Sequence, residues 1–266
     1  MLITWNHPPI HLVKISIITV CKNAEAMIGD CIRSVQEQRY NDVEHWIIDG
    51  TSTDDTLSEI KASGHLDEFL LSEPDDGLYE AMNKGLALAS GDVIGFLHAD
   101  DLYAHPQVLE TVAQTMEPPN IDACYADLSY VSPDDLNHIT RYWRSEPYRP
   151  GLFRKGWMLP HPTFFARREI YEKFDNFDTQ FTIGADWDLL LRFIEVNRIN
   201  TQYVPGLWVK MRTGGASNRS LSNIIRNNRQ CWKAFSKYDL RPSPSYPFYK
   251  LFHRLSQFVN KPAKGE

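Results

Sequence analysis

Apolar and polar residues in the first half of the chain alternate with two different periods. Residues 15–20 read ISIITV, a short and almost unbroken apolar run that is typical of a parallel strand buried on both faces. Over residues 28–35 apolar side chains recur at spacings of three and four, which predicts a helix with one apolar face. Residues 45–49 and 69–71 predict two further strands, and the helix between them is expected to have Thr53 as its N-cap.

The alternation of strands and helices continues as far as Met116. An apolar stripe at helical spacing predicts a helix over residues 78–89, closed by Gly91, and the run VIGFLHA at residues 93–99 predicts the next strand. A further helix is expected to open at Pro106, because proline suits the first helical position. This order predicts a mainly parallel, doubly wound α/β sheet with helices on both faces.

The pattern becomes less regular in the second half of the chain. Residues 121–131 and 139–144 predict a β-hairpin, and residues 161–166 predict a strand that is followed by a helix. The strongest helical stripe of this half covers residues 186–196. We expect these segments to extend the parallel sheet on one side.

Charge divides the chain into an acidic body and a basic tail. The net charge is −6, but residues 219–266 carry ten lysine and arginine residues against two acidic ones, which leaves −14 on the residues before them. Aromatic residues lie among these cations, a combination that suits an anionic membrane surface. A solvated helical tail or a contact in a homodimer explains it equally well. We expect a main domain over residues 1–217 and a helical tail over residues 218–266, and the acidic body argues against nucleic acid as a partner.

The cysteines and the N-terminus indicate the cellular compartment in which the protein is expected. The four cysteines (Cys21, Cys31, Cys124 and Cys231) have no CxxC spacing, which indicates free thiols in a reducing compartment. The N-terminus lacks the charged and then apolar layout of a signal peptide. No apolar stretch approaches the ~20 residues that span a bilayer. We expect a cytoplasmic protein, and any membrane contact is expected to be peripheral, at the inner face of the plasma membrane.

Two adjacent carboxylates, Asp100 and Asp101, follow the strand predicted at residues 93–99. Like charges so close oppose each other's ionisation, and a hard divalent cation with oxygen ligands would resolve the conflict. The alternative is that Asp101 caps a turn and Asp100 is solvated. Asp49 ends a neighbouring strand, and ligands of such sheets bind beyond the carboxyl ends of the strands. The acidic residues that end these two strands are therefore expected at the same edge of the sheet, where a ligand would bind.

Three segments carry a resemblance to a known family: SIITVCKNAEAMIGDCIRSVQEQ, WIIDGTSTDDT and DGLYEAMNKGLALASGDVIGFLHADD. Together with the later GADWDL segment they resemble the nucleotide-sugar domain of family 2 glycosyltransferases. The sequences DGLYEAMNKG and FLHADD are similar to those of bacterial enzymes that build surface polysaccharides. The resemblance covers residues 14–217. It implies the A-type glycosyltransferase fold and an inverting transfer from a nucleoside-diphosphate sugar, with UDP favoured, to a saccharide or polyprenyl-linked saccharide. It also implies Mn²⁺ or Mg²⁺ as cofactor.

The resemblance assigns most of the donor site. Thr19 is expected against the base or ribose, and Asp49 resembles the carboxylate that accepts a hydrogen bond from the ring N–H of uracil. Asp100 and Asp101 correspond to the family's Asp-x-Asp metal motif, although His98 stands where the first Asp of that motif is common. The metal ligand is then Asp100 or Asp101, and His98 is expected to pack beside it.

Three more residues are expected at the donor. Asn83 and Lys84 lie in the helix before the acidic strand, and Arg212 is expected near the diphosphate. Arg212 precedes Gly214 and Gly215, and a loop with such a hinge can close over a charged donor. An exposed loop arginine is the alternative.

The resemblance assigns the general base to Asp186, at the start of a helix after the sheet. Such a base takes the proton of the acceptor hydroxyl. Ala185 replaces the acidic residue that usually precedes it, and Asp188 is expected only to favour the first helical turn through the helix dipole. His161 and Trp157 are expected on the acceptor side, Trp157 as a platform for a sugar ring and His161 with buried packing as its alternative.

Two other functions are consistent with parts of the sequence. A catalytically inactive relative that binds a nucleotide as a scaffold would explain Ala185 and His98. A nucleotidyltransferase also joins acidic metal ligands to a nucleotide-binding sheet. It would show a glycine-rich loop with a cation after the first strand, however, and TVCKNAEAM contains no glycine. Glycosyl transfer is therefore the function that the sequence favours.

Overall fold

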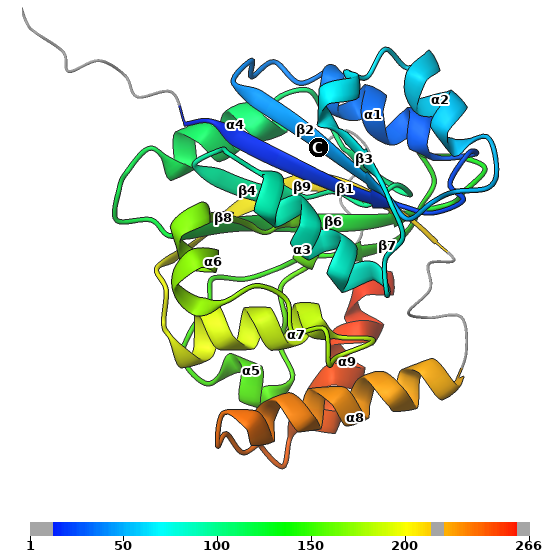
Figure 1. The fold of residues 1–266 in the computed structure, drawn as a ribbon. Helices are drawn as coiled ribbons and strands as arrows, with labels where there is room; N and C mark the ends of the chain where they lie inside the picture. The colour runs from blue at the N-terminus through cyan, green and yellow to red at the C-terminus, as the bar shows by residue number, and fades with distance from the viewer. Residues whose placement is uncertain (1–12, 214–220, 260–266) are drawn as a thin grey trace, which may run out of the picture.

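The computed structural model describes residues 13–213 and 221–259, in which nine strands form one sheet with helices on both faces (Figure 1). The strands are β1 (Ile15–Cys21), β2 (Val43–Asp49), β3 (Leu70–Ser72), β4 (Val93–Phe96), β5 (Asp101–Tyr103), β6 (Ala123–Val131), β7 (Ile139–Trp143), β8 (Phe165–Arg167) and β9 (Thr201–Arg212). The helices are α1 (Ile28–Gln36), α2 (Thr56–Ala62), α3 (Leu78–Leu88), α4 (Val108–Met116), α5 (Leu152–Lys155), α6 (Arg168–Phe174), α7 (Ala185–Leu190), α8 (Leu221–Lys237) and α9 (Tyr246–Val259). Shorter helical turns are η1 (Asp67–Phe69), η2 (His161–Thr163) and the π-helical η3 (Leu191–Val196).

The sheet has a parallel half and a mixed half. Its order is β3-β2-β1-β4-β8-β6-β9-β5, with β7 beside β6. β1 pairs in parallel with β2 and β4, whereas β8 runs antiparallel to both β4 and β6. β6 pairs in parallel with β9 and forms the predicted hairpin with β7. The predicted α/β class is confirmed, and the less regular second half of the chain supplies the antiparallel strands.

Two helical layers cover the sheet because successive residues of a strand point to opposite faces. Ile15 and Ile17 of β1 pack in a cluster with residues of α1 and α4. Ile18 and Val20 instead pack with α3 and with the helices below the sheet in Figure 1. Gly85 lets α3 approach the sheet closely, since a Cβ at this position would overlap the Ile18 side chain.

Two helices begin later than the sequence predicts. α2 begins at Thr56 rather than directly after Thr53, because the Asp54 carboxylate accepts hydrogen bonds from the backbone and hydroxyl of Thr56. α4 begins at Val108, two residues after Pro106, and the intervening residues form a turn. Both differences are confined to the first turn of a helix that is otherwise as predicted.

The strands around the acidic pair are shorter than predicted. The strand expected over residues 93–99 ends at Phe96, and the chain then turns into the acidic pair. Pro162 has no N–H for strand pairing, and residues 161–163 form η2 instead of the start of a strand. The helix predicted over residues 186–196 is α7 followed by η3.

The two C-terminal helices lie on the helical layer below the sheet, beside α5 and α7 (Figure 1). Cys231, Ala234 and Phe235 of α8 are buried in the same core cluster as α3 and α7. The predicted boundary between residues 217 and 218 lies outside the described residues. No helix in the described ranges combines the length and the apolar character needed to cross a membrane.

The four cysteines are free, as predicted. Cys21, Cys31, Cys124 and Cys231 are all buried, and none of them forms a disulfide. Burial raises the pKa of Cys31 to about 12, so this thiol stays protonated near neutral pH. The four cysteines therefore act as small apolar core residues.

Candidate active site

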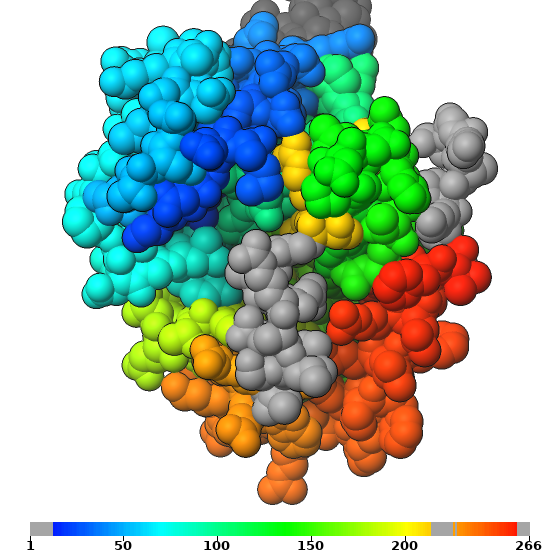
Figure 2. All heavy atoms as spheres, turned by 90° about the vertical axis from the view of Figure 1, so that its right-hand side faces the viewer, coloured from blue at the N-terminus to red at the C-terminus, as the bar shows by residue number. Residues whose placement is uncertain are grey.

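The carboxyl ends of β1, β2 and β4 meet at one edge of the sheet, as parallel pairing requires. Figure 2 looks onto this edge, where the surface is hollowed between the blue N-terminal segments and the green region of β6 and β7. The acidic pair follows β4 at this edge, and Arg212 ends β9 beside it. We call this hollow the mouth.

Arg212 supports the acidic pair from behind. It is buried, and its Nη1 donates a hydrogen bond of 3.2 Å to the backbone oxygen of Asp100. Its Nη2 pairs with the carboxylate of Asp30 in α1. One cation thus joins α1, β9 and the acidic turn. The predicted hinge, Gly214 and Gly215, lies outside the described residues.

The Asp101 carboxyl group follows the strand that ends beside the mouth. It is fully buried, and within the described part of the chain neither of its oxygens has a hydrogen-bond partner. Burial raises the pKa of Asp101 well above its ordinary value, the charge of Asp100 raises it further, and Arg212 opposes the rise. A buried polar group left without a partner costs about 1–3 kcal/mol. A cation beside Asp100 and Asp101 would supply the missing partner.

The acidic pair fits a divalent cation only as part of a shared site. Across residues 13–213 and 221–259, no group of three or more His, Cys, Asp or Glu side chains is arranged to hold a metal ion. Mg²⁺ is commonly bound through one or two carboxylates together with substrate phosphates and water. Asp100 and Asp101 therefore suit a cation that takes its other oxygen ligands from a bound diphosphate.

The charges of Asp100 and Asp186 both act on His98. Burial lowers the pKa of His98, while the negative charges of Asp100 and Asp186 raise it. Burial and the neighbouring His98 also lower the pKa of His161 to about 3. Asp100, Asp186 and His161 are therefore all near enough to His98 to interact with it electrostatically.

Asp186 stands in the first turn of α7, where Tyr79 of α3 reaches it. The Tyr79 hydroxyl donates to Asp186 Oδ1 at 3.3 Å and accepts a hydrogen bond of 2.9 Å from the Gly184 N–H. Burial raises the pKa of Asp186, and hydrogen bonds from the Trp187 backbone and from Tyr79 limit the rise. A partly buried carboxylate with a raised pKa is suited to accept a proton near neutral pH.

Asp49 ends β2, but its carboxylate is turned inward. The side chain is fully buried, and its oxygens accept hydrogen bonds from the backbone and hydroxyl of Ser52 and from the Ser72 hydroxyl at 2.6 Å. These bonds tie the turn after β2 to β3. The expected contact between Asp49 and a base stays a prediction, and in this structure both carboxylate oxygens are already bonded to Ser52 and Ser72.

Asp75 lies beside Gly50, directly after the end of β2. Its carboxylate fills the space that a Cβ on Gly50 would need, and the Lys22 side chain borders the same space. Lys84 fixes this turn, since its Nζ donates to the backbone oxygen of Pro74 at 2.6 Å. The sequence held the signal for Asp75, because this residue follows the third predicted strand and so reaches the same edge as the other strand ends.

Two further predicted donor contacts are structural in this arrangement. Thr19 is fully buried within β1, and its hydroxyl bonds His45 Nε2 at 2.8 Å beneath α1. Asn83 bonds both backbone groups of Phe177, the N–H at 3.0 Å and the oxygen at 2.9 Å. Each side chain bonds a neighbouring element, and a contact of either with the donor stays a prediction.

The residues predicted on the acceptor side are packed inside. Trp157 is fully buried, with its ring centroid 5.3 Å from that of Phe153, so the expected stacking on a sugar is wrong. His161 is almost fully buried and stacks on Phe96 at 5.7 Å. Its Nε2 has no hydrogen-bond partner in the described segments. Buried packing, the alternative for His161, describes its position beside His98.

Asp188 lies in the first turn of α7, as predicted, and it is also a buried anchor. Its carboxylate accepts hydrogen bonds from Lys237 Nζ at 3.2 Å and from the Tyr238 hydroxyl at 3.1 Å. Arg192 lies 3.9 Å away on the same helical stretch. These contacts fasten α8 to α7, and so to the element that carries Asp186.

Comparisons with known proteins point to one family. A family model described as Glycosyl transferase family 2 matches residues 16–176. An uncharacterized glycosyltransferase of Mycobacterium tuberculosis (strain CDC 1551 / Oshkosh) is 33% identical over 180 residues, which cover 67% of this chain and 68% of the relative. The matched region contains β1, the acidic pair and the Tyr79 segment.

Two solved structures are similar in fold at low sequence identity. The structure of TarS residues 1–349 from S. aureus with UDP-GlcNAc has a TM-score of 0.65 and 16% identity, and covers 93% of this chain and 72% of that one. The mannosyltransferase PcManGT from Pyrobaculum calidifontis with GDP-Man and Mn²⁺ has a TM-score of 0.62 and 18% identity, with coverages of 93% and 70%. At such identities the likeness concerns the fold alone.

Proposed function

The chain belongs to glycosyl transferase family 2, and from this premise we propose a metal-dependent, inverting transfer from a nucleoside-diphosphate sugar to a hydroxyl group. We propose UDP as the nucleotide and a saccharide or lipid-linked saccharide of a bacterial surface polysaccharide as the acceptor. The observation that carries the proposal is the position of His98, which feels the charges of both Asp100 and Asp186. This observation supports a site in which the groups for leaving-group stabilisation and for proton removal are neighbours.

Asp186 is the proposed general base. The acceptor oxygen attacks the anomeric carbon of the donor, its proton passes to Asp186, and the bond between that carbon and the diphosphate oxygen breaks. A single displacement of this kind inverts the anomeric centre. Tyr79 holds the carboxylate toward the mouth and limits the rise in its pKa. A positioned base of this kind contributes about 10² to 10⁴ in rate.

Asp100 and Asp101 are the proposed holders of Mn²⁺ or Mg²⁺. When bound, the cation neutralises negative charge that develops on the diphosphate, an effect of several kcal/mol. Asp101 contributes a buried carboxyl group that lacks a partner, and Asp100 contributes one that is partly exposed. Arg212 keeps the acidic turn in place through the Asp100 backbone.

The nucleotide is proposed to lie at the ends of β1 and β2. Asp75, in the space beside Gly50, is placed to accept a hydrogen bond from the ring N–H of uracil, and Lys22 borders the same space. Guanine also presents ring N–H donors. TarS was solved with UDP-GlcNAc and the Pyrobaculum mannosyltransferase with GDP-Man, so the preference for uridine depends on Asp75 and its surroundings rather than on the fold.

A catalytically inactive nucleotide-binding protein is the competing proposal. It is favoured by Ala185 before the base and by the absence, among the described residues, of a complete set of protein metal ligands. Nucleotide binding alone would satisfy Asp101 and Asp75. Only turnover distinguishes the two proposals.

A panel of nucleotide sugars tests the proposal in two stages. Melting temperatures are measured with each donor, with and without Mn²⁺, because a ligand at 100 times its Kd stabilises a protein by about 2.7 kcal/mol. Release of the nucleoside diphosphate is then measured for the donor with the largest shift. A metal-dependent shift with slow release supports an enzyme. A shift without any release, with or without saccharide acceptors, supports the inactive binding protein.

Peripheral contact with an anionic membrane is also part of the proposal. The basic and aromatic composition of residues 218–266 supports it, and a lipid-linked acceptor would make it useful. A homodimer contact through the same segment is the alternative.

A further inference from the structure

The outward side of α9 is apolar. Six large side chains of this helix are more than half exposed: Phe248 (74%), Leu251 (59%), Phe252 (72%), Leu255 (56%), Phe258 (53%) and Val259 (80%). We call these six residues the α9 face. Their spacings of three and four residues place them along one side of the helix. Exposed apolar surface that is continuous over three turns usually marks a binding site.

The inward side of α9 is the more polar one. Tyr246 and Gln257 are buried against the protein, and Lys250 donates a hydrogen bond of 2.9 Å to Asn228 of α8. His253 is partly buried and stacks on Tyr249. An ordinary surface helix buries its apolar stripe and exposes its polar one. α9 does the reverse, so its packing on this chain does not explain its sequence.

Charge indicates what covers the α9 face. Residues 221–259 carry seven lysine and arginine residues and one acidic residue, a net charge of +6, while the rest of the chain carries −12. Two copies that met through this face would bring two segments of +6 together and repel each other. An anionic lipid surface would attract the same segment, with about a fivefold gain in affinity for each cation near the surface.

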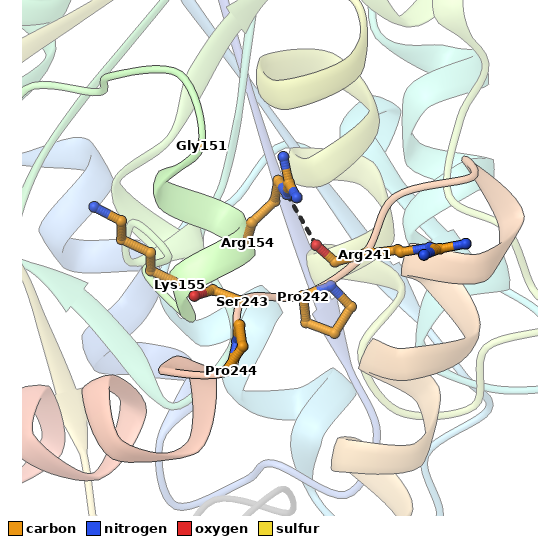
Figure 3. Close-up of a pocket in the computed structure, with 7 residues that line it drawn as sticks. All are labelled: Gly151, Arg154, Lys155, Arg241, Pro242, Ser243 and Pro244. Carbon is orange, nitrogen blue, oxygen red and sulfur yellow. Dashed lines mark hydrogen bonds between the residues drawn. The ribbon is translucent and has the colours of Figure 1, made fainter.

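A basic pocket lies where α9 begins. Figure 3 shows this pocket, of about 490 Å³, between α5 and the segment that leads into α9. Arg154 Nε donates to the backbone oxygen of Arg241 at 2.8 Å and holds its two sides together. Lys155 and Arg241 are exposed, and neither side chain has a hydrogen-bond or ion-pair partner in the region that the structure describes. The two free cations suit a lipid phosphate.

We propose that α9 lies in the interface of a membrane that contains anionic lipids. The α9 face enters the boundary between headgroups and acyl chains, and Lys155 and Arg241 contact headgroup phosphates. In Figure 2 the red α9 is visible in the same view as the mouth, so a membrane bound there lies beside the mouth rather than behind the molecule. The inference rests on the membrane contact proposed above and names the helix that makes it. It does not depend on turnover, because an inactive nucleotide-binding protein would bind the same membrane.

Vesicle sedimentation with the full chain tests the apolar contact. The parent protein is expected to sediment with vesicles of phosphatidylcholine and phosphatidylglycerol in equal parts, and much less with phosphatidylcholine alone. The double substitution Phe252→Ser and Leu255→Ser is expected to weaken binding by about 100-fold, since each inserted side chain contributes about one tenfold step. Leu66→Ser with Leu78→Ser is the matched control, because these leucines are exposed on other elements. The control is expected to bind like the parent.

Two further measurements separate the possible outcomes. Lys155→Glu with Arg241→Glu is expected to lower binding to the mixed vesicles by about tenfold or more, while Lys61→Glu with Lys173→Glu changes it little. Melting temperatures close to the parent value show that each variant is folded. Equal vesicle binding by the parent and the Phe252→Ser, Leu255→Ser variant overturns the proposal. The proposal is overturned as well if the parent does not bind vesicles and is a dimer in sedimentation velocity while the Phe252→Ser, Leu255→Ser variant is a monomer.

Discussion

The Tyr79 hydroxyl lies 3.3 Å from Asp186 Oδ1 and receives the Gly184 N–H at 2.9 Å. Burial and the charge of Asp186 raise the pKa of Tyr79, so this hydroxyl stays a hydrogen-bond donor across the neutral range. A donor to a carboxylate favours its charged form. The pair therefore links α3, which carries the DGLYEAMNKG segment, to the residue proposed as the base.

Replacing Tyr79 by Phe should shift the pH dependence of transfer. The base acts when it is deprotonated, so activity is lost as the pH falls through the pKa of Asp186, which burial has already raised. Loss of the Tyr79 donor raises that pKa further and should move the acidic limb of kcat/KM to higher pH. The limb is measured with the donor that the nucleotide panel identifies.

Tyr171→Phe is the matched control for this shift. Tyr171 is also buried, but its hydroxyl has no hydrogen-bond partner among the residues that the structure describes. Its loss should leave the pH profile unchanged. If Tyr79→Phe lowers the rate equally at every pH, Tyr79 acts on packing and not on the base.

Local patterns predicted the frame of this site better than its contacts. β1, β2 and α3 were predicted because the burial of each element shows in the spacing of its own apolar residues. The inward turn of Asp49 depends on Ser52 and Ser72, and the burial of Asp188 depends on Lys237 in a different helix. Such contacts join distant segments, and the spacing of residues along the chain does not predict them.

The same limit explains Trp157 and Asp75. An aromatic residue in a loop segment has the same sequence whether it stacks on a sugar or on Phe153, and only the neighbouring elements decide. Asp75 follows a strand only three residues long, whose end is hard to place from the sequence. Its position beside Gly50 becomes visible once β2 and β3 are paired.

Asp101→Asn should separate metal binding from folding. The buried carboxyl group has no hydrogen-bond partner in the described chain and has a raised pKa, so a neutral amide should leave the melting temperature without metal unchanged or slightly higher. The rise in melting temperature caused by Mn²⁺ with UDP should fall to a small part of the parent value. Differential scanning fluorimetry measures both. A full Mn²⁺ response in Asp101→Asn would remove this residue from the metal site, and Asp100→Asn then shows whether its neighbour acts alone.

Asp75→Ala and Asp49→Asn should have opposite signatures. Asp75→Ala removes the proposed hydrogen bond to the base and should weaken UDP binding by about 10- to 100-fold, the equivalent of about 1.5–3 kcal/mol. The melting temperature should fall only slightly, because the one bond lost within the protein is an exposed one from the Gly77 N–H at 2.9 Å. Asp49→Asn disturbs the bonds to Ser52 and Ser72 and should lower the melting temperature. Titration calorimetry and thermal melts compare the two. The assignment is reversed if Asp49→Asn loses affinity at parental stability while Asp75→Ala binds normally.

Asp188→Asn should destabilise the protein rather than only weaken a helix dipole contact. Its buried carboxylate accepts hydrogen bonds from Lys237 and Tyr238, and a hydrogen bond to a charged group contributes about 1.5–3 kcal/mol. The free energy of unfolding should fall by that amount in urea titrations. Asp178→Asn, which breaks a more exposed bond to the same lysine, should cost less than about 1 kcal/mol. Equal losses in the two variants would show that burial at Asp188 adds nothing.

Asp186→Asn should separate proton transfer from donor binding. The amide keeps the size of the side chain and can still accept the Tyr79 hydrogen bond, but it cannot take a proton from the acceptor hydroxyl. Transfer should fall by about 10² or more, and its acidic limb should disappear because the titrating group is gone. Affinity for the nucleoside diphosphate with Mn²⁺ should stay close to the parent value, since the base faces the acceptor rather than the diphosphate.

Asp100→Asn provides the contrast. It should weaken metal-dependent donor binding by about tenfold, which is a loss in binding and not in the chemical step. Near-parental turnover by Asp186→Asn with the true acceptor would assign the base to another residue. His98 would then be the next residue to replace, because the charges of Asp100 and Asp186 both act on it and burial lowers its pKa.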